Sequence, residues 1–338
     1  MKSVLIEQMA PVIKDEIDKA HKILLHCHPN PDPDSVGSAL AMYHWLELMG
    51  KQVTVIAGDS EKPDNLAILP GFDDIKQQTY GETDLADFDL FVALDSGSTN
   101  MITRTTPVEF PEHLQVVVID HHSSNHGYGK INLIETEYPA VAQILYDLFE
   151  IWEVPLTDNI AICLFVGIFY DTGGFRYRKT TAHTFAAAAR LIEFYPDFST
   201  VISHISDQLL PDHLYYRGLA YDHIDVVGKN NVAIIALSQA QIENRKIDEE
   251  GVKNQSLAST LITVRGWDIG VSIIEKKLNH NEISFRTRYP DVFDMAKIAE
   301  LLGGGGHKVA AGVLVLGTNE EAKAKVVDAI YTAYPELR

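Results

Sequence analysis

The stretch that decides the fold runs Lys22-Ile-Leu-Leu-His-Cys-His-Pro-Asn-Pro-Asp-Pro-Asp34. Its first six residues form a short apolar run, which is typical of a buried strand in a parallel sheet. Its second half places one imidazole and two carboxylates, those of His28, Asp32 and Asp34, within seven residues. Because prolines fix φ and exclude regular structure, we expect a stiff loop that holds these three side chains toward a common point.

Further apolar runs at residues 52–57, 89–94 and 115–119 have the same character as residues 22–27. Residues 35–49 carry apolar side chains at helical spacing, and Gly50 follows as the expected cap. Strands that alternate with helices predict an α/β fold, here a parallel sheet with helices on both faces. In such sheets the functional groups gather at the C-terminal ends of the strands.

The pattern changes after residue 139. We expect helices at 140–152, 158–170 and 182–191, then strands at 232–236, 268–276, 282–288 and 309–316, with helices at 294–302 and 319–334. These elements predict three parts: an N-terminal domain at residues 1–195, a helical connector at 196–229, and a smaller α/β C-terminal domain at 230–338.

The charge balance limits the choice of partners. The chain of 338 residues has 28 Lys plus Arg against 47 Asp plus Glu, a formal net charge of −19. A protein that grips long nucleic acid needs many cations along the phosphates, so no long nucleic acid is expected as a partner. A small pocket for a short anionic substrate is compatible with this composition.

Membrane attachment and a disulfide scaffold are not expected either. The longest apolar run, at residues 160–170, is far below the roughly 20 residues that span a bilayer, and the N-terminal residues lack the pattern of a signal peptide. Cys27 and Cys163 are the only two cysteines, too few for a disulfide scaffold or a cysteine-based zinc cage. A reducing cytoplasm is the expected location.

More polar residues stand at the ends of later elements. Asp95 follows the run at 89–94, Asp120-His121-His122 closes the run at 115–119, and Asp171 ends the helix expected at 158–170. Each alone has a simpler explanation, such as a helix cap or a solvated turn. A carboxylate at a helix C-terminus opposes the helix dipole, however, so Asp171 needs a compensating charge.

Taken together, these residues form a set of six metal ligands with mixed nitrogen and oxygen donors. Such a set suits Mn²⁺, Fe²⁺ or Zn²⁺ and can hold two divalent ions about 3.5–4 Å apart. Asp95 is the candidate bridge between the ions. The six candidates are His28, Asp32, Asp34, Asp95, His121 and Asp171.

A glycine run near the C-terminus is a candidate anion site. It reads Gly303-Gly304-Gly305-Gly306-His307 and is followed by Lys308. Glycines let backbone N–H groups approach an anion closely and form a nest for phosphate. Arg286 on the preceding strand can bind a phosphate through two parallel hydrogen bonds, with Arg288 expected on the same face. A flexible linker is the alternative, but apolar segments flank the run on both sides.

These motifs, in this order, resemble the DHH phosphoesterase family with its DHH-associated C-terminal domain. The matching segments are His28-x-x-Pro31-Asp32-x-Asp34, residues 94–97, residues 120–122, residues 170–173 and residues 303–312. Size and domain order are most similar to the nanoRNase group, which degrades very short RNA and removes the 3′ phosphate from 3′-phosphoadenosine 5′-phosphate.

The resemblance implies a two-metal hydrolase that uses Mn²⁺, with Mg²⁺ or Co²⁺ as alternatives. It implies that His28 and Asp32 hold one ion, and that Asp95 bridges to a second. The second ion would then be held by Asp34, His121 and Asp171.

The resemblance also implies roles beyond the metals. Asp120 would support its neighbours, and His122 would contact the scissile phosphate. The substrate-binding residues carried over onto the C-terminal domain are Arg286, Gly304, Gly305, Gly306 and His307. One departure concerns the second motif: many relatives place an Arg soon after it, whereas Met101 stands there and Arg104 follows slightly later, so no role is carried onto Arg104.

The expected activity is hydrolysis of short oligoribonucleotides and 3′,5′-bisphosphonucleotides. Three alternatives stay open on the sequence: a phosphodiesterase for linear or cyclic dinucleotide signals, an exopolyphosphatase, and a nucleotide-binding sensor without catalysis. The physiological metal and the choice between monomer and homodimer stay open as well.

Overall fold

The computed structural model describes residues 2–207, 209–252 and 256–338. The chain divides into two compact units, residues 1–208 and 209–338. This division falls inside the segment at 196–229 that the sequence suggested as a connector, and Gln208 itself lies outside the described residues. Among the described residues, no helix is both long enough and apolar enough to cross a membrane.

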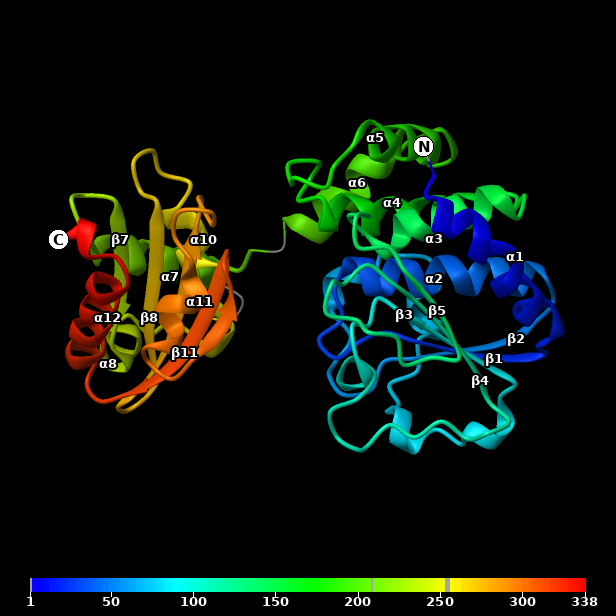
Figure 1. Ribbon diagram of the computed structural model, residues 1–338, viewed down its shortest axis with the longest axis horizontal. Helices are drawn as coiled ribbons and strands as arrows, with labels where there is room; N and C mark the ends of the chain where they lie inside the picture. Colours follow the sequence, from blue (N-terminus) through cyan, green and yellow to red (C-terminus); the bar gives the residue numbers. More distant parts are fainter. Residues whose placement is uncertain (1, 208, 253–255) are drawn as a thin grey trace. The chain divides into compact units, whose positions relative to one another are not determined.

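The first unit is built on a five-stranded parallel sheet, which confirms the predicted fold class (Figure 1). In spatial order its strands are β2 (Gln52–Ile56), β1 (Lys22–His26), β3 (Leu90–Leu94), β4 (Gln115–Asp120) and β5 (Ile131–Ile134). The sequence did not predict β5, because four residues that include Asn132 carry too weak an apolar signal. The crossovers place β1, β3 and β4 side by side, so the three predicted strand ends are neighbours.

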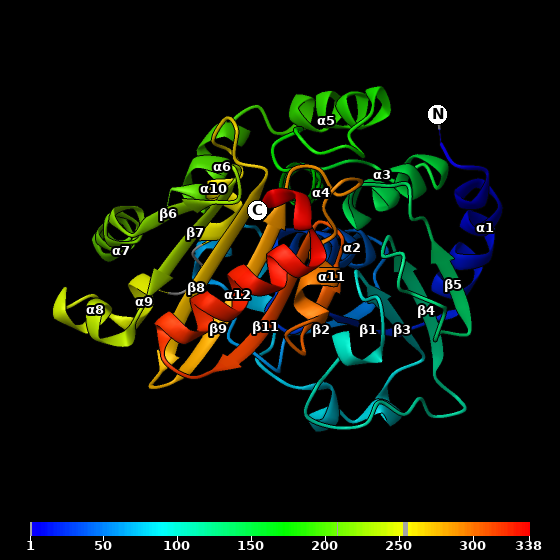
Figure 2. The same ribbon diagram turned by 60° about the vertical axis from the view of Figure 1, so that its left-hand side comes forward.

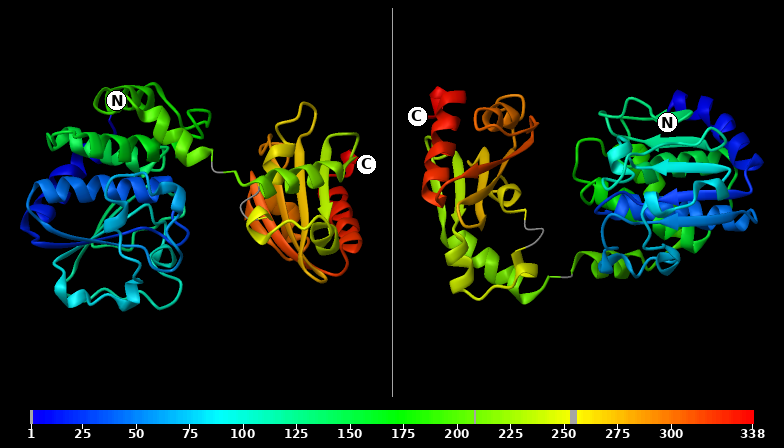
Figure 3. Two further views of the ribbon diagram at one scale, coloured as in Figure 1. Left: turned by 180° about the vertical axis from the view of Figure 1, so that it is seen from behind. Right: turned by 90° about the horizontal axis from the view of Figure 1, so that it is seen from below.

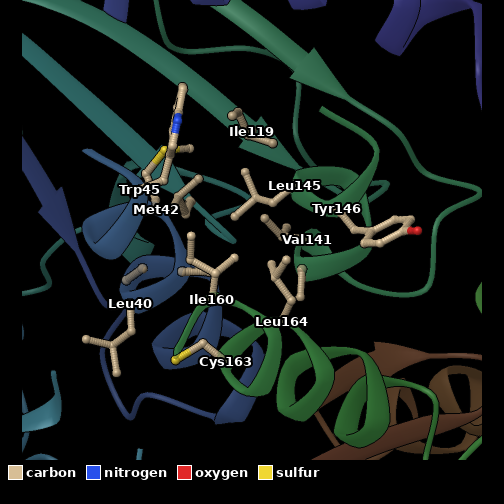
Figure 4. Close-up of a cluster of buried hydrophobic side chains, with 14 of the residues drawn as sticks. Leu40, Met42, Trp45, Ile119, Val141, Leu145, Tyr146, Ile160, Cys163 and Leu164 are labelled. Atoms are coloured by element: carbon tan, nitrogen blue, oxygen red, sulfur yellow. The ribbon is translucent and has the colours of Figure 1, made fainter. Parts of the chain in front are cut away.

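The α-helices of the first unit contribute to a single core on one face of this sheet. They are α1 (Val4–Lys19), α2 (Pro33–Leu48), α3 (Val141–Ile151), α4 (Asp158–Asp171), α5 (Ala182–Phe194) and α6 (Phe198–Ser206). Figure 4 shows part of this core, where Ile119 of β4 faces apolar side chains of α2, α3 and α4.

The opposite face of the sheet is covered differently from the expected layer of helices. Its apolar cluster combines strand residues such as Phe91 with Tyr80, Leu85 and Phe110, which come from 3₁₀ turns and loops. Prolines and glycines recur in this segment, at positions 63, 70, 71 and 81, and they prevent longer α-helices from forming.

The second unit is a six-stranded mixed sheet. Its strands lie in the order β10 (Gly305–His307), β11 (Ala310–Leu316), β9 (His280–Thr287), β8 (Ile269–Lys277), β7 (Val232–Leu237) and β6 (Ile224–Val227). Only β7 and β8 pair in parallel. One face packs on α11 (Met295–Glu300) and α12 (Asn319–Ala333), as Figure 2 shows.

The other face of this sheet is covered only in part. Helices α7 (Pro211–Asp222) and α10 (Leu257–Leu261) pack on β7 and β8, and Figure 3 shows α7 on this side. The short helices α8 (Gln239–Asn244) and α9 (Glu249–Val252) lie between β7 and α10 along the chain. Within the described chain, the apolar cluster on this face includes no residue of β9 or β11, so polar side chains of these strands are left accessible there.

Candidate functional site

The strand order of the first unit positions three of the predicted ligands. His28 lies two residues after β1, Asp95 and His121 directly follow β3 and β4, and these strands are adjacent in the sheet. Because the C-terminal ends of parallel strands meet at one edge, the three side chains converge. The order of the strands in the sheet is therefore enough to bring these three side chains together.

Helix α2 supplies two more carboxylates. Asp32 is its N-cap, and Oδ1 accepts hydrogen bonds from the backbone N–H groups of Asp34 (3.0 Å) and Ser35 (2.9 Å). Asp32 Oδ2 lies 3.4 Å from His28 Nε2. The two explanations of Asp32 suggested by the sequence, helix cap and metal ligand, therefore use different oxygens of one side chain.

Asp34 is fully buried and joins α2 to α3. Its Oδ2 accepts from Val141 N at 2.7 Å, and its Oδ1 accepts from Ala142 N at 2.9 Å. The residue before α3, Ala140, has no side chain able to cap the helix, so Asp34 provides the cap from another part of the chain.

Asp171 reaches the same place from the last turn of α4, which crosses α2 in close contact. Glycines make this approach feasible. A Cβ at Gly37 would lie 2.4 Å from the carbonyl oxygen of Cys163, and a Cβ at Gly167 would lie 2.6 Å from Asp34 Oδ1. A larger residue at either position would therefore push the two helices apart.

All six predicted ligands come together in two triads of potential metal ligands, which are His28, Asp32 and Asp95, and Asp34, His121 and Asp171. A third triad, Asp95, His121 and His122, shares one residue with each of them. Asp95 connects them, because its Oδ2 lies 3.5 Å from His28 Nε2 and its Oδ1 lies 3.5 Å from His121 Nε2. His121 Nε2 is also 3.4 Å from Asp171 Oδ2.

The spacing of these atoms fits cations better than direct hydrogen bonds. Separations of 3.4–3.5 Å between imidazole nitrogen and carboxylate oxygen exceed a good hydrogen bond. Two ligand atoms that share an ion at ~2.1 Å lie roughly 3.0–3.4 Å apart. The donor set of two imidazoles and four carboxylates is likewise suited to divalent ions of the first transition row.

The imidazole rings are turned so that their metal-binding nitrogens face the carboxylates. His28 Nδ1 donates to the carbonyl oxygen of Pro29 (3.1 Å), and His121 Nδ1 donates to that of Tyr138 (3.3 Å). A proton fixed on Nδ1 leaves the lone pair on Nε2, and Nε2 is the atom that each ring presents to the cluster.

Asp95 carries the strongest sign that the site is built for cations. Its side chain is only 2% exposed, and its Oδ1 is buried without a hydrogen-bond partner among the described residues. Its backbone has φ of 51°, a left-handed conformation that is uncommon for a residue other than glycine. A buried, unpartnered carboxylate oxygen on a strained backbone is costly, and a cation would compensate it.

The electrostatics of the cluster without ions point the same way. Burial and the nearby charges of Asp34 and Asp95 raise the pKa of Asp171 to about 9. Burial and Asp95 raise the pKa of Asp34 to about 7. Burial alone would lower the pKa of His28, but the carboxylates of Asp32 and Asp95 outweigh it and raise the pKa to about 10. When no ion is bound, protons on these groups therefore reduce the repulsion between the buried carboxylates, as bound cations would.

Asp120 and His122 form a pair beside the triads. Asp120 is fully buried, and its Oδ1 accepts from His122 Nδ1 at 2.8 Å. This hydrogen bond raises the pKa of His122, whose side chain is 42% exposed. The Nδ1 atom of His122 is therefore engaged by Asp120, and the side chain is partly open to solvent.

Sequence reasoning missed the residues that hold this pair in place. Asn125 Nδ2 donates to Asp120 Oδ2 (2.8 Å) and to the carbonyl oxygen of Ser96 (3.1 Å), so it links the ends of β4 and β3. Tyr138, whose carbonyl oxygen orients His121, was missed as well. The only sequence signal for Asn125 is its place five residues after Asp120, which is weak without knowledge of the turn.

Arg104 stands apart from the cluster. Its backbone N–H donates to the carboxylate of Asp59, while its exposed guanidinium lies 3.9 Å from the sulfur of Met101. Nothing in these contacts gives Arg104 a role in the site.

In the second unit, the pairing of strands relates Arg286 to His307. Arg286 is opposite Ala310 across β9 and β11, and Ala310 is opposite His307 across β11 and β10. Directly paired residues project to the same face, so Arg286 and His307 share the accessible face of this sheet. Arg288 differs from the expectation, because its guanidinium donates to the carbonyl oxygen of Ile262.

The glycine run serves mainly to build the edge of the second sheet. Gly303 (φ 84°) ends α11, and Gly304 N donates to the carbonyl oxygen of Ala299. Side chains at Gly304 and Gly306 would lie 2.4 Å and 2.5 Å from backbone atoms of β11, whereas Gly305 faces open space. Close packing therefore explains Gly304 and Gly306, whereas Gly303 and Gly305 have open space beside them.

We predict that Gly167→Ala destabilises the protein and weakens binding of divalent ions, because the new methyl group would collide with Asp34 Oδ1. Overpacking of this kind costs about 1–3 kcal/mol. Urea unfolding and metal titration measure the two effects. Gly218→Ala in α7, where a Cβ meets nothing within 4 Å, is the matched control. Equal stability and metal affinity for Gly167→Ala and the wild type would contradict the prediction.

We also predict that binding of divalent ions releases protons. Because the pKa values of Asp34 and Asp171 are raised to about 7 and about 9, both groups hold protons at neutral pH that an ion must displace. The apparent affinity should therefore increase as the pH rises from 6 to 9. Calorimetry in two buffers with different ionisation enthalpies measures the protons released. Heats that do not depend on the buffer would contradict this prediction.

Comparison with known proteins agrees with this geometry. The family model described as the DHH family, N-terminal domain, matches residues 22–168. The bifunctional oligoribonuclease and PAP phosphatase NrnA of Thermus thermophilus is 27% identical over 311 residues, covering 91% of this chain and 89% of that protein. The protein of the same name from Bacillus subtilis is 23% identical and covers 88% of this chain and 90% of its own length.

A solved structure shares the fold. The crystal structure of an exopolyphosphatase-related protein from Bacteroides fragilis has a TM-score of 0.85 and 21% identity, and it covers 100% of this chain and 99% of its own. The matched segment spans β1 to the last turns of α4 and contains every predicted metal ligand except Asp171, which lies three residues beyond it. Residues 22–168 therefore match the N-terminal domain of the DHH family, and most of the chain is similar to the two relatives named above.

Proposed function

We propose that this protein is a two-metal phosphoesterase that hydrolyses very short oligoribonucleotides and removes the 3′ phosphate from 3′-phosphoadenosine 5′-phosphate. The observation that carries the proposal is the bridging position of Asp95 between two triads of potential metal ligands. Relatives named as oligoribonuclease and PAP phosphatase, which cover most of both chains, support the choice of substrate.

In this proposal the two ions are Mn²⁺. His28 and Asp32 would hold one ion, Asp34, His121 and Asp171 would hold the other, and Asp95 would contribute to both. When bound, two such cations lower the pKa of a water molecule and stabilise the charge that develops on phosphoryl oxygens. The protein contributes rings and carboxylates that are already oriented, so little reorganisation is needed on binding.

His122 acts on the leaving side of the reaction. Asp120 accepts a hydrogen bond from Nδ1 of this ring, which fixes the direction of the ring and raises its pKa. The free Nε2 can then donate a hydrogen bond to the scissile phosphate and a proton to the departing oxygen. Asn125 keeps Asp120 in position through its contact with Asp120 Oδ2.

The second unit would bind the substrate. Arg286 and His307 offer cationic and hydrogen-bonding groups on one sheet face, with Gly304, Gly305 and Gly306 forming the adjacent edge. We place the hinge between the units within the segment at 196–229, where the two units meet along the chain, and we expect closure to help exclude water. A cytoplasmic location and a homodimer belong to the same proposal and rest on the resemblance to the family.

We predict that the protein releases mononucleotides from pApA in the presence of Mn²⁺ and that the rate falls steeply with chain length. Asp95→Asn should lower kcat by at least about a thousandfold, because asparagine tolerates the left-handed backbone but removes the bridging charge. Asp73→Ala is the control, because Asp73 is an exposed acid that is not one of the predicted metal ligands. Unchanged phosphate release by Asp95→Asn would refute the ligand assignment.

Arg286→Gln should raise KM for pApA by about 10- to 100-fold while kcat changes little, since a charged hydrogen bond contributes roughly 1.5–3 kcal/mol to binding. Arg265→Gln removes the same charge from an exposed position and serves as the control. Steady-state kinetics on both variants separate the two parameters, and an equal KM for both would show that Arg286 does not contact the substrate.

A further inference from the structure

The segment that leads into α3 contacts two of the three residues in one triad of potential metal ligands. The backbone N–H groups of Val141 and Ala142 donate to Asp34, at 2.7 Å and 2.9 Å. Three residues before Val141, the carbonyl oxygen of Tyr138 lies 3.3 Å from Nδ1 of His121. The position of this segment therefore determines where both Asp34 and His121 are held.

The other triad is supported in a different way. His28 donates from Nδ1 to the carbonyl oxygen of Pro29 and from its backbone N–H to Ser35 Oγ, at 3.1 Å and 3.0 Å. Asp32 accepts from the backbone N–H groups of Asp34 and Ser35. All of these partners lie within seven residues of His28. Support for His28 and Asp32 is therefore local, whereas the second triad depends on a distant part of the chain.

A buried carboxylate fixes the side chain of Tyr138. Asp147 on α3 is fully buried, and its Oδ2 accepts a hydrogen bond from the Tyr138 hydroxyl at 2.5 Å. The same hydroxyl accepts from the backbone N–H of Ser3, the N-cap of α1, at 3.2 Å. The far end of the Tyr138 ring is thus held by two elements, while the backbone carbonyl of this residue orients the ring of His121.

His183 completes this network from the first turn of α5. Its Nε2 lies 2.8 Å from Oδ1 and 2.9 Å from Oδ2 of Asp147, and its side chain is 18% exposed. A buried carboxylate is unfavourable without such donors. Among the described residues, Tyr138 and His183 are the only hydrogen-bond partners of the Asp147 side chain. The network therefore has one outlet toward the metal ligands, which is Tyr138.

We propose that Asp147 and His183 are positioning residues that act through Tyr138 on one of the two ions. They hold the carbonyl group that orients His121, and they thereby set the affinity of the ion whose triad contains His121. The ion beside His28 does not depend on them. The inference rests on the proposed function and deepens it, because it gives the two ions separate supports in the fold.

Two full-length background variants separate the ions for the test. Asp32→Asn keeps an N-cap for α2 but removes a ligand of the ion beside His28, and Asp171→Asn removes a ligand of the ion beside His121. Calorimetric titration with Mn²⁺ then measures the remaining site in each background. Tyr138→Phe should weaken Mn²⁺ binding about tenfold in Asp32→Asn and less than about twofold in Asp171→Asn. Equal weakening in both backgrounds would overturn the proposal.

Tyr146 offers a matched control on the same helix. It is also buried, and its hydroxyl also donates to a carboxylate, that of Glu150 at 3.0 Å (Figure 4). Among the described residues, no hydrogen bond connects this pair to His121. Tyr146→Phe should leave the affinity for Mn²⁺ unchanged in both backgrounds. Urea unfolding of each variant reports stability, and losses of affinity that match for Tyr138→Phe and Tyr146→Phe would overturn the proposal.

Replacements of His183 distinguish positioning from a merely structural role. His183→Ala removes the donor to Asp147 and should weaken Mn²⁺ binding severalfold in the Asp32→Asn background. His183→Gln provides an N–H group that can reach the same carboxylate, so it should restore most of the affinity. An affinity of His183→Ala equal to that of the unsubstituted background would overturn the role of His183.

A separate measurement keeps this inference distinct from the proposed function. Release of mononucleotides from pApA by the wild-type protein with Mn²⁺ tests catalysis. Absence of that activity, together with selective weakening by Tyr138→Phe, would refute the catalytic proposal and retain the positioning network. Activity together with equal Mn²⁺ affinities for Tyr138→Phe and Tyr146→Phe would do the reverse. A wild-type protein that binds no Mn²⁺ would overturn both.

Discussion

The first unit depends on the crowding of negative charge around one buried carboxylate. Asp95 lies between two imidazoles, and three further carboxylates lie within reach of those rings. Burial of so much charge is unfavourable unless cations or protons neutralise it. The parallel strand order, the left-handed backbone at Asp95 and the glycine contacts between α2 and α4 all serve to bring these groups to one place.

The parts of this arrangement that follow from local patterns could be predicted from the sequence. Apolar runs of five or six residues located β1 to β4, and the polar residues that follow β1, β3 and β4 could be assigned to one sheet edge. The short edge strands β5, β6 and β10 were not predicted, because three or four residues carry little periodicity. Helix α1 was not predicted either, although its buried residues follow helical spacing: Ile6, Ala10, Ile13 and Ile17.

Contacts between distant segments could not be predicted. Asp34 caps α3 across more than one hundred residues, and nothing near either position indicates the pairing. The glycine run illustrates the opposite difficulty. Its composition suggested an anion nest, but two of its glycines are required by the closeness of β11 and one by the end of α11. A residue type that suits a ligand can equally suit a neighbouring strand.

The capping contact of Asp34 affects how sequences of this kind should be compared. Its carboxylate supports the start of a helix as well as the cluster, so folding alone would preserve it in a descendant that had abandoned catalysis. Asp171 accepts no hydrogen bond within the described chain, and its carboxylate lies beside the ring of His121 and the carboxylate of Asp34. Loss of an acid at the end of α4 is therefore a more informative marker of an inactive lineage than retention of the aspartates near the start of α2.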